Sequence, residues 1–285
     1  MNKPSLTIFT SMTNPDERND PWRQALQCYE QLADNVIVVG EKWPYEFSWD
    51  TIGKTFQEGF EKCESDWVIR MDIDYFFHEK DFLKIRNALS KFIKFPVVAF
   101  PQYQFFNPKN YQIKTRLCLA FNKKAFPYIK LNGGGDLTLA TLDNILINPK
   151  MVPNINSPIY QYDSTFRTKE IIGEDRARFA RAWFRYFGSY GDRGGPTNEE
   201  AYNAWYKMVL DRYPKHIFNL KINDHPKFIK ESLNMLEPDQ FGYNLFGLKN
   251  NLHFPIKNYL KGYREKYLNP VFLSKYKFIN HYLNN

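Results

Sequence analysis

The sequence has little of what defines several protein classes. Its three cysteines, Cys28, Cys63 and Cys118, are odd in number and widely spaced, so they form no zinc-binding pattern and predict no disulfide framework. No segment approaches the roughly 20 apolar residues that cross a bilayer, and the first apolar stretch is too short for a signal peptide. We therefore expect a cytoplasmic protein, bacterial or from a virus-infected cell, without a transmembrane segment.

Motifs of several large enzyme classes are missing as well. The sequence has no G-x-x-x-x-G-K-[ST], no G-x-G-x-x-G after its first apolar run and no G-x-S-x-G. These absences argue against a P-loop nucleotidase, a typical dinucleotide-binding fold and an α/β-hydrolase. Apolar residues (43%) and charged residues (25%) are ordinary in number, whereas aromatic residues reach 18%, which indicates a thick core or exposed stacking surfaces.

Apolar periodicity predicts alternating strands and helices in the first half of the chain. Short apolar runs indicate strands over residues 5–12, 35–40, 66–74 and 96–102, and helical spacing lies between them over residues 21–33, 51–64 and 80–95. This alternation predicts an α/β fold with a mostly parallel sheet and helices on both faces. The run at 35–40 is almost entirely apolar, which is typical of a strand covered on both sides.

Later segments are less regular. Residues 116–121 (RLCLAF) favour another strand, and residues 170–187 and 199–212 favour helices. We expect residues 131–136 (LNGGGD) to form a loop, because three successive glycines rarely hold a regular element.

Two carboxylates end the third predicted strand, in the stretch ESDWVIRMDIDYFFHEKD. Alternation places Arg70, Asp72 and Asp74 on one face, at the carboxyl end of a strand, where open α/β sheets bind ligands. Two such carboxylates could hold Mg²⁺ or Mn²⁺ with a diphosphate in the remaining positions. The alternative is a solvated strand end or a helix cap, with Arg70 paired to Asp72.

The segments SLTIFTSM, NVIVVGE, IGKTFQEGFEKCE, DWVIRMDID and RLCLAFNKKAF resemble the N-terminal half of a GT-A glycosyltransferase of the family 2 type, over about residues 5–145. The resemblance implies a GT-A-like (Rossmann-like) core in which Asp72 and Asp74 bind the metal-bridged diphosphate of a nucleotide-sugar. By position, Glu41 would lie near the nucleoside, Thr10 and Ser11 would line the same pocket, and Arg70 would contact phosphate.

An inverting transfer needs a carboxylate base, and two candidates remain open. Asp175 occupies the place of the family's Glu-Asp pair, and the following RARFARAW is similar to the Q/R-x-x-R-W motif with one extra residue before Trp183. Asp136 follows three glycines that let the backbone approach a ligand closely, and Asp143 is a third option. The alternative for Asp175 is a helix N-terminus favoured by the dipole.

Some GT-A enzymes supply a late histidine as a further metal ligand, and His225 in NDHP would take that role here. The alternative is a loop histidine ordered by Pro226. His78 follows the aspartates more closely but is expected to begin the next helix.

The C-terminal segment is basic and aromatic. Residues 251–285 carry six lysines and arginines against one glutamate, which accounts for +5 of the net charge of +8, and Tyr259, Tyr263 and Tyr267 recur every fourth residue. Such a helix could stack on nucleic-acid bases or lie on an anionic membrane. Alternatively it packs its tyrosines on the main domain and leaves its lysines in water.

These observations predict three parts: a nucleotide-sugar-binding core (1–150), an acceptor-side completion of the same domain (151–250) and a helical, basic extension (251–285). The predicted activity is metal-dependent transfer of a sugar to an acceptor hydroxyl, on a glycan or on a modified DNA base. Two alternatives stay open: a nucleotidyltransferase that uses the same D-x-D, and a non-catalytic nucleic-acid-binding protein that uses the basic tail.

Overall fold

A computed structural model describes residues 3–41, 43–134, 137–237 and 255–268. The described strands are β1 Leu6–Ser11, β2 Asn35–Val39, β3 Trp67–Asp72, β4 Tyr75–Phe77, β5 Val97–Phe105, β6 Asn110–Asn122, β7 Lys130–Gly134, β8 Leu137–Leu142, β9 Ile145–Leu146, β10 Ile159–Gln161 and β11 Phe218–Asn219. The described helices are α1 Trp22–Leu32, α2 Asp50–Lys62, α3 Phe82–Lys91, α4 Lys169–Phe187, α5 Asn198–Arg212, α6 Lys230–Asn234 and α7 Ile256–Tyr263.

The main sheet has the order β2-β1-β3-β6-β5-β10-β4, with β11 paired to β6. β1 pairs in parallel with β2 and β3, and β5 in parallel with β10. β6 lies antiparallel between β3 and β5, and β4 is antiparallel to β10. The expected mostly parallel sheet is therefore a mixed one: β3 and β5 run the same way but are separated by a strand of opposite direction.

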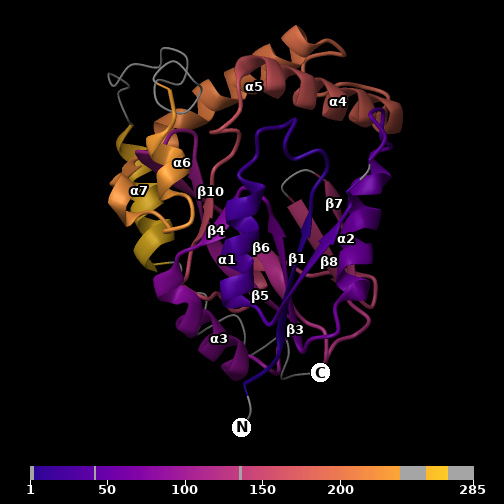
Figure 1. The fold of residues 1–285 in the computed structure, drawn as a ribbon, viewed down its shortest axis with the longest axis vertical. Helices are drawn as coiled ribbons and strands as arrows, with labels where there is room; N and C mark the ends of the chain where they lie inside the picture. The colour runs from indigo at the N-terminus through magenta and orange to yellow at the C-terminus, as the bar shows by residue number, and fades with distance from the viewer. Residues whose placement is uncertain (1–2, 42, 135–136, 238–254, 269–285) are drawn as a thin grey trace.

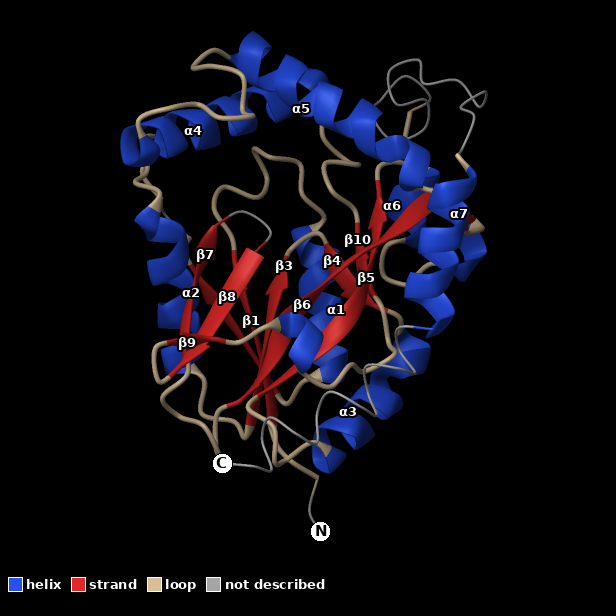
Figure 2. Cartoon of the chain, turned by 180° about the vertical axis from the view of Figure 1, so that it is seen from behind, coloured by secondary structure: helices blue, strands red, loops and turns tan. Residues whose placement is uncertain are grey.

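Helices cover both faces of this sheet, as predicted (Figures 1 and 2). One apolar cluster joins α1 and α3 to the sheet, through side chains such as Tyr29 and Leu89. A second cluster joins α2 to the other face, through Phe56 and Phe60. Alternation along β1 places Ile8 in the first cluster and Phe9 in the second, as a doubly covered strand requires.

Two local predictions were wrong. β2 is the edge strand of the sheet and is mostly half-buried. Its apolar run therefore does not mean that other elements cover both of its faces. The LNGGGD stretch is not a loop throughout, because β7 and β8 pair from Lys130 to Gly134. A Cβ atom on Gly134 would lie 2.5 Å from the Trp49 ring. This glycine therefore lets β7 pack closely against the start of α2.

α4 and α5 lie across the carboxyl end of the sheet, above β1 and β3 (Figure 1). α4 begins at the Thr168 cap and ends at Gly188 in the left-handed region, and α5 begins with a capping box between Thr197 and Glu200. Both helices agree with the periodicity of the sequence. The pair covers the edge at which the strand-end aspartates lie.

The C-terminal helix α7 packs beside β11. A Cβ atom on Gly262 would lie 2.6 Å from Ile217, and the Tyr263 ring meets Phe218 edge to face at 5.7 Å. Tyr259, Tyr263 and Tyr267 remain between 39% and 56% exposed. Residues 269–285 lie outside the described part of the chain. Among the described residues, no helix combines the length and apolar character that a membrane crossing requires.

Candidate functional site

A cavity of about 130 Å³ lies at the carboxyl ends of β1 and β3, beneath α4. It is lined by residues that follow these strands, by α2 and by the segment that leads into α4. Charged side chains dominate it: the four carboxylates Asp72, Asp74, Asp163 and Asp175, and the four guanidinium groups Arg18, Arg70, Arg167 and Arg176. The structure therefore brings Asp72, Asp74, Arg70 and Asp175, all singled out from the sequence, to one place.

Arg70 and Asp72 form a two-pronged ion pair at the end of β3. The Nη1 atom of Arg70 donates to Asp72 Oδ2 at 2.9 Å, and its Nη2 atom contacts Oδ1. The Arg70 side chain is 1% exposed and lies over the Phe56 ring, whereas the Asp72 side chain is 23% exposed. The hydroxyl group of Tyr29 donates to the Asp72 carbonyl at 2.5 Å. Of the two roles considered for Arg70, the structure contains the ion pair.

Asp74 does not continue the alternation of β3, because the strand ends at Asp72 and Asp74 lies in the following turn. Its side chain nevertheless lines the same cavity. Burial raises its pKa well above the usual range, and the nearby carboxylates of Asp72, Asp20 and Asp163 raise it further, while Arg167 opposes them. A cation placed here would remove this repulsion and ionise Asp74.

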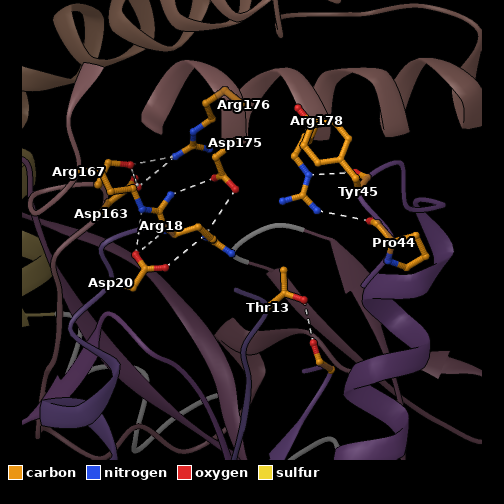
Figure 3. A network of polar contacts seen from close by, with 12 residues as sticks. Thr13, Arg18, Asp20, Pro44, Tyr45, Asp163, Arg167, Asp175, Arg176 and Arg178 are labelled. Carbon is orange, nitrogen blue, oxygen red and sulfur yellow. Dashed lines mark hydrogen bonds and ion pairs between the residues drawn. The ribbon is translucent and has the colours of Figure 1, made fainter. Parts of the chain in front are cut away.

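Asp175 belongs to a buried network of alternating charges (Figure 3). Arg167 Nη1 lies 3.0 Å from Asp175 Oδ2, Arg167 Nη2 lies 2.7 Å from Asp20, and Arg18 Nε lies 3.4 Å from Asp175 Oδ1. Burial alone would raise the pKa of Asp175, but Arg18, Arg167, Arg176 and Arg178 lower it to about 2. This carboxylate is firmly ionised and acts as an anchor for arginines, which makes it a poor proton acceptor at neutral pH.

The segment between β10 and α4 supplies two cavity residues that the sequence reading missed. Asp163 accepts hydrogen bonds from Arg176 at 3.1 Å and from Gln104 at 3.2 Å, and Arg167 holds Asp175. Ser164 between them has φ of 59°, a strained value for a serine and one that tends to occur at functional sites. The signal was polar residues directly after a strand, but β10 has only three residues and gave no clear pattern.

Several nitrogen atoms around the cavity are buried and make no hydrogen bond within the described part of the chain. They are Trp43 Nε1, Arg70 Nε and Arg176 Nε. Arg18 Nε makes no hydrogen bond either, but it lies within ion-pair distance of Asp20 Oδ2 at 3.3 Å and of Asp175 Oδ1 at 3.4 Å. Buried donors are almost always paired in proteins, so this group indicates that an acceptor is supplied from outside. A phosphate oxygen is one acceptor that suits a guanidinium nitrogen.

Other predicted residues lie apart from these groups. Ser11 lines the cavity, but Thr10 is buried and does not line it, and Glu41 is exposed in the turn after β2. Asp143 is exposed in the β8–β9 turn with φ of 51°, a turn position that aspartate tolerates. Asp136 lies outside the described residues.

His225 is not part of this site, and its assignment as a metal ligand is corrected. Its Nε2 atom donates to the Pro108 carbonyl at 2.8 Å, so Nδ1 accepts the hydrogen bond from Tyr162 Oη at 2.7 Å. Burial lowers its pKa to about 4, and the ring packs against Phe105. Both ring nitrogens are used within the core, which leaves no lone pair for a metal.

The donor set suits a cation that is shared with a ligand. Nowhere in the described residues do three or more histidine, cysteine or acidic side chains gather in a way that could hold a metal ion. Mg²⁺ is commonly held by one or two carboxylates together with phosphate oxygens and water. The Asp72 and Asp74 carboxylates, which line one cavity, are the groups at this strand end that could share such a cation with a ligand.

Comparison with known proteins gives little. No protein-family model matches the chain, and no curated protein matches it in sequence. Among solved structures, residues 1–349 of TarS from S. aureus share 10% identity at a TM-score of 0.31, over 75% of this chain and 81% of that chain. A longer S. aureus TarS structure gives 10% identity and a TM-score of 0.30, over 82% of this chain and 46% of that chain. TM-scores this low carry no conclusion about function.

Proposed function

We propose that this chain is a glycosyltransferase that moves a sugar from a nucleotide-diphosphate donor to an acceptor hydroxyl. The proposal is carried by one observation: the strand-end aspartates Asp72 and Asp74 share a cavity with Arg18, Arg167 and Arg176. Carboxylates suit a divalent cation, and guanidinium groups suit phosphate oxygens. Together the two sets match a metal-bridged diphosphate in the ligand crevice of an α/β sheet.

Each group has a defined part in this proposal. Asp74 and Asp72 would hold Mg²⁺ or Mn²⁺, which would supply positive charge next to a diphosphate leaving group. Arg176 donates from its buried Nε atom to a phosphate oxygen, and Arg18, which is held by Asp20 and Asp175, adds positive charge beside it. Asp175 positions Arg18 and Arg167 and does not take the proton, because its pKa is about 2. Asp136 remains the candidate base.

The size of the cavity limits what it encloses. Pockets that hold a whole small-molecule ligand usually measure roughly 300–1,000 Å³, whereas this one measures about 130 Å³. It suits the cation and the phosphates, and the nucleoside and the sugar extend beyond it. Trp43 and Phe179, which line the cavity, are apolar surfaces for these parts.

Calorimetry with a panel of nucleotide-diphosphate sugars, with and without Mn²⁺, tests the proposal. We expect one donor to bind only with Mn²⁺, and Asp74→Asn to weaken that binding by at least about tenfold, because changes even to residues that orient a metal ligand cost about 10–100-fold in metal affinity. The matched control is Asp143→Asn, the same change in an exposed turn, which leaves binding intact. Metal-independent binding, or equal binding by Asp74→Asn, would contradict the proposal.

The base is tested separately by Asp136→Asn. This change should leave donor binding in place and lower transfer by roughly 100-fold or more, which is the usual contribution of a general base. Full transfer by Asp136→Asn would exclude Asp136 as the base.

A further inference from the structure

A stripe of aromatic side chains runs along α4 from the cavity to the protein surface. Asp175, Phe179, Trp183 and Phe187 recur every fourth residue and therefore share one face of the helix. Asp175 and Phe179 line the cavity, and Phe187 is 49% exposed. At about 1.5 Å per residue, the stripe is roughly 18 Å long.

The rings of this stripe are in contact. Trp49, at the start of α2, meets Trp183 edge to face with ring centroids 4.9 Å apart, and the ring centroids of Trp183 and Phe187 are 3.8 Å apart. Tyr186 extends the surface, 4.7 Å from Phe187 and 59% exposed. Figures 1 and 2 both place this end of α4 above α2. We call Phe179, Trp183, Tyr186, Phe187 and Trp49 the aromatic track.

The charges beside the aromatic track are already paired. Arg178 donates to the Tyr45 carbonyl at 2.9 Å, and Arg181 donates to Glu46 at 2.8 Å. Arg185 binds Glu46 and the Phe47 carbonyl. Arg193, which stacks on Trp183 at 3.6 Å, pairs with Asp192 at 3.0 Å. Single-stranded nucleic acid requires cations for its phosphates as well as rings for its bases, and these arginines are committed to protein oxygens.

We infer that the aromatic track binds a neutral carbohydrate chain, the acceptor of the proposed transfer. Sugar rings present flat apolar C–H faces that pack on aromatic rings, and their hydroxyl groups stay in water. The chain lies along α4 and delivers its reacting hydroxyl to the cavity. The small cavity supports this arrangement, because an acceptor longer than one residue has to continue outside it. The inference deepens the proposed function and rests on it.

The test is binding of labelled protein to an array of neutral hexose and N-acetylhexosamine oligosaccharides, with a 12-residue oligo(dT) alongside. We expect wild type to retain at least one oligosaccharide, and the double variant Tyr186→Ala/Phe187→Ala to bind it at least about tenfold more weakly. Phe187→Tyr, which keeps the ring, retains binding. The matched control Tyr128→Ala removes a ring that is 79% exposed outside the track and should bind as wild type.

Other outcomes separate this inference from the proposed function. Retention of no oligosaccharide, or equal binding by the double variant, would overturn the inference. Retention of oligo(dT) that depends on Tyr186 and Phe187 would overturn it in favour of nucleic acid. Calorimetry with donor and Mn²⁺ on the same proteins judges the proposed function independently, and the double variant should bind donor as wild type does.

Discussion

The cavity at the carboxyl ends of β1 and β3 and the cluster around His225 both keep titratable groups away from water. In the His225 cluster both ring nitrogens are hydrogen-bonded and the surrounding rings are apolar. In the cavity, Asp74 faces other carboxylates, and Arg70 and Arg176 each have a buried nitrogen without a hydrogen bond. The buried groups of the His225 cluster therefore find their partners within the protein, whereas those of the cavity do not.

The difference lies in consecutive residues of one segment. Tyr162 points into the core and binds His225, whereas Asp163 lines the cavity. Both residues directly follow β10, so the end of one short strand supplies both regions. A buried polar residue is therefore informative about function only when its partners are known.

The largest expected effect weakens the charge network of the cavity. Asp175→Asn removes one of the two carboxylates that pair with Arg18 and the buried Arg167 and leaves Asp20 as the other. We expect a loss of about 3 kcal/mol of unfolding free energy at pH 7, the low end of the range for a broken buried pair. The folded-state pKa of about 2 lies below the usual 3.8, so the contribution is present above pH 4 and is lost as the pH falls toward 2. Urea unfolding at pH 7 and pH 3 measures both effects.

Asp143→Asn is the control, since this side chain is exposed and should change stability by less than about 0.5 kcal/mol. Equal stability of Asp175→Asn and wild type at pH 7 would show that the network does not hold α4 in place.

A smaller effect is expected in the cluster around His225. His225→Phe removes both hydrogen bonds and leaves the Tyr162 hydroxyl and the Pro108 carbonyl unpaired, which costs about 1–3 kcal/mol. Affinity for donor and Mn²⁺ should change by less than about twofold. Urea unfolding and calorimetry separate the two readouts. Loss of metal-dependent binding at full stability would restore His225 as a ligand.

Unlike the two preceding variants, Asp74→Asn should raise the free energy of unfolding. The folded-state pKa of Asp74 is raised, so the folded protein holds a proton that the unfolded chain releases above about pH 4, and wild-type stability falls as the pH rises. Asparagine cannot ionise, so Asp74→Asn removes this pH-dependent loss, and we expect the variant to be more stable than wild type at pH 7. Thermal unfolding between pH 4 and pH 8 checks the slope, and destabilisation at pH 7 would contradict it.

The smallest effect is expected at Glu41, which lies in neither region. Glu41→Gln should alter stability by less than about 0.5 kcal/mol and donor affinity by less than about twofold. A large loss of donor affinity would mean that the turn after β2 contacts the nucleoside, as the family resemblance implied.

Local sequence signals predicted the helices and the strand ends well. Periodicity located α1, α2, α4 and α5 within a few residues, and the position of Asp72 and Asp74 after an apolar run predicted the edge at which the cavity lies. The paired role of Arg70 was open from the sequence, because strand alternation brings it to Asp72 but does not decide what it binds.

Long-range pairing could not be predicted in the same way. β6 inserts antiparallel between β3 and β5, and no local pattern encodes that neighbour. Arg18, Asp163 and Arg167 come from loops whose positions depend on the whole fold. His225 resembled a ligand because its partners, Tyr162 and Pro108, lie 63 and 117 residues away.

Binding of Mn²⁺ followed by electron paramagnetic resonance tests the central claim most directly. Free Mn²⁺ gives a signal that is lost on binding, so wild type and Asp74→Asn can be titrated with and without a nucleoside diphosphate. The account predicts tight binding by wild type only when the diphosphate is present, and loss of that binding in Asp74→Asn. Equal Mn²⁺ binding by both proteins, or none by wild type with any nucleoside diphosphate, would contradict it.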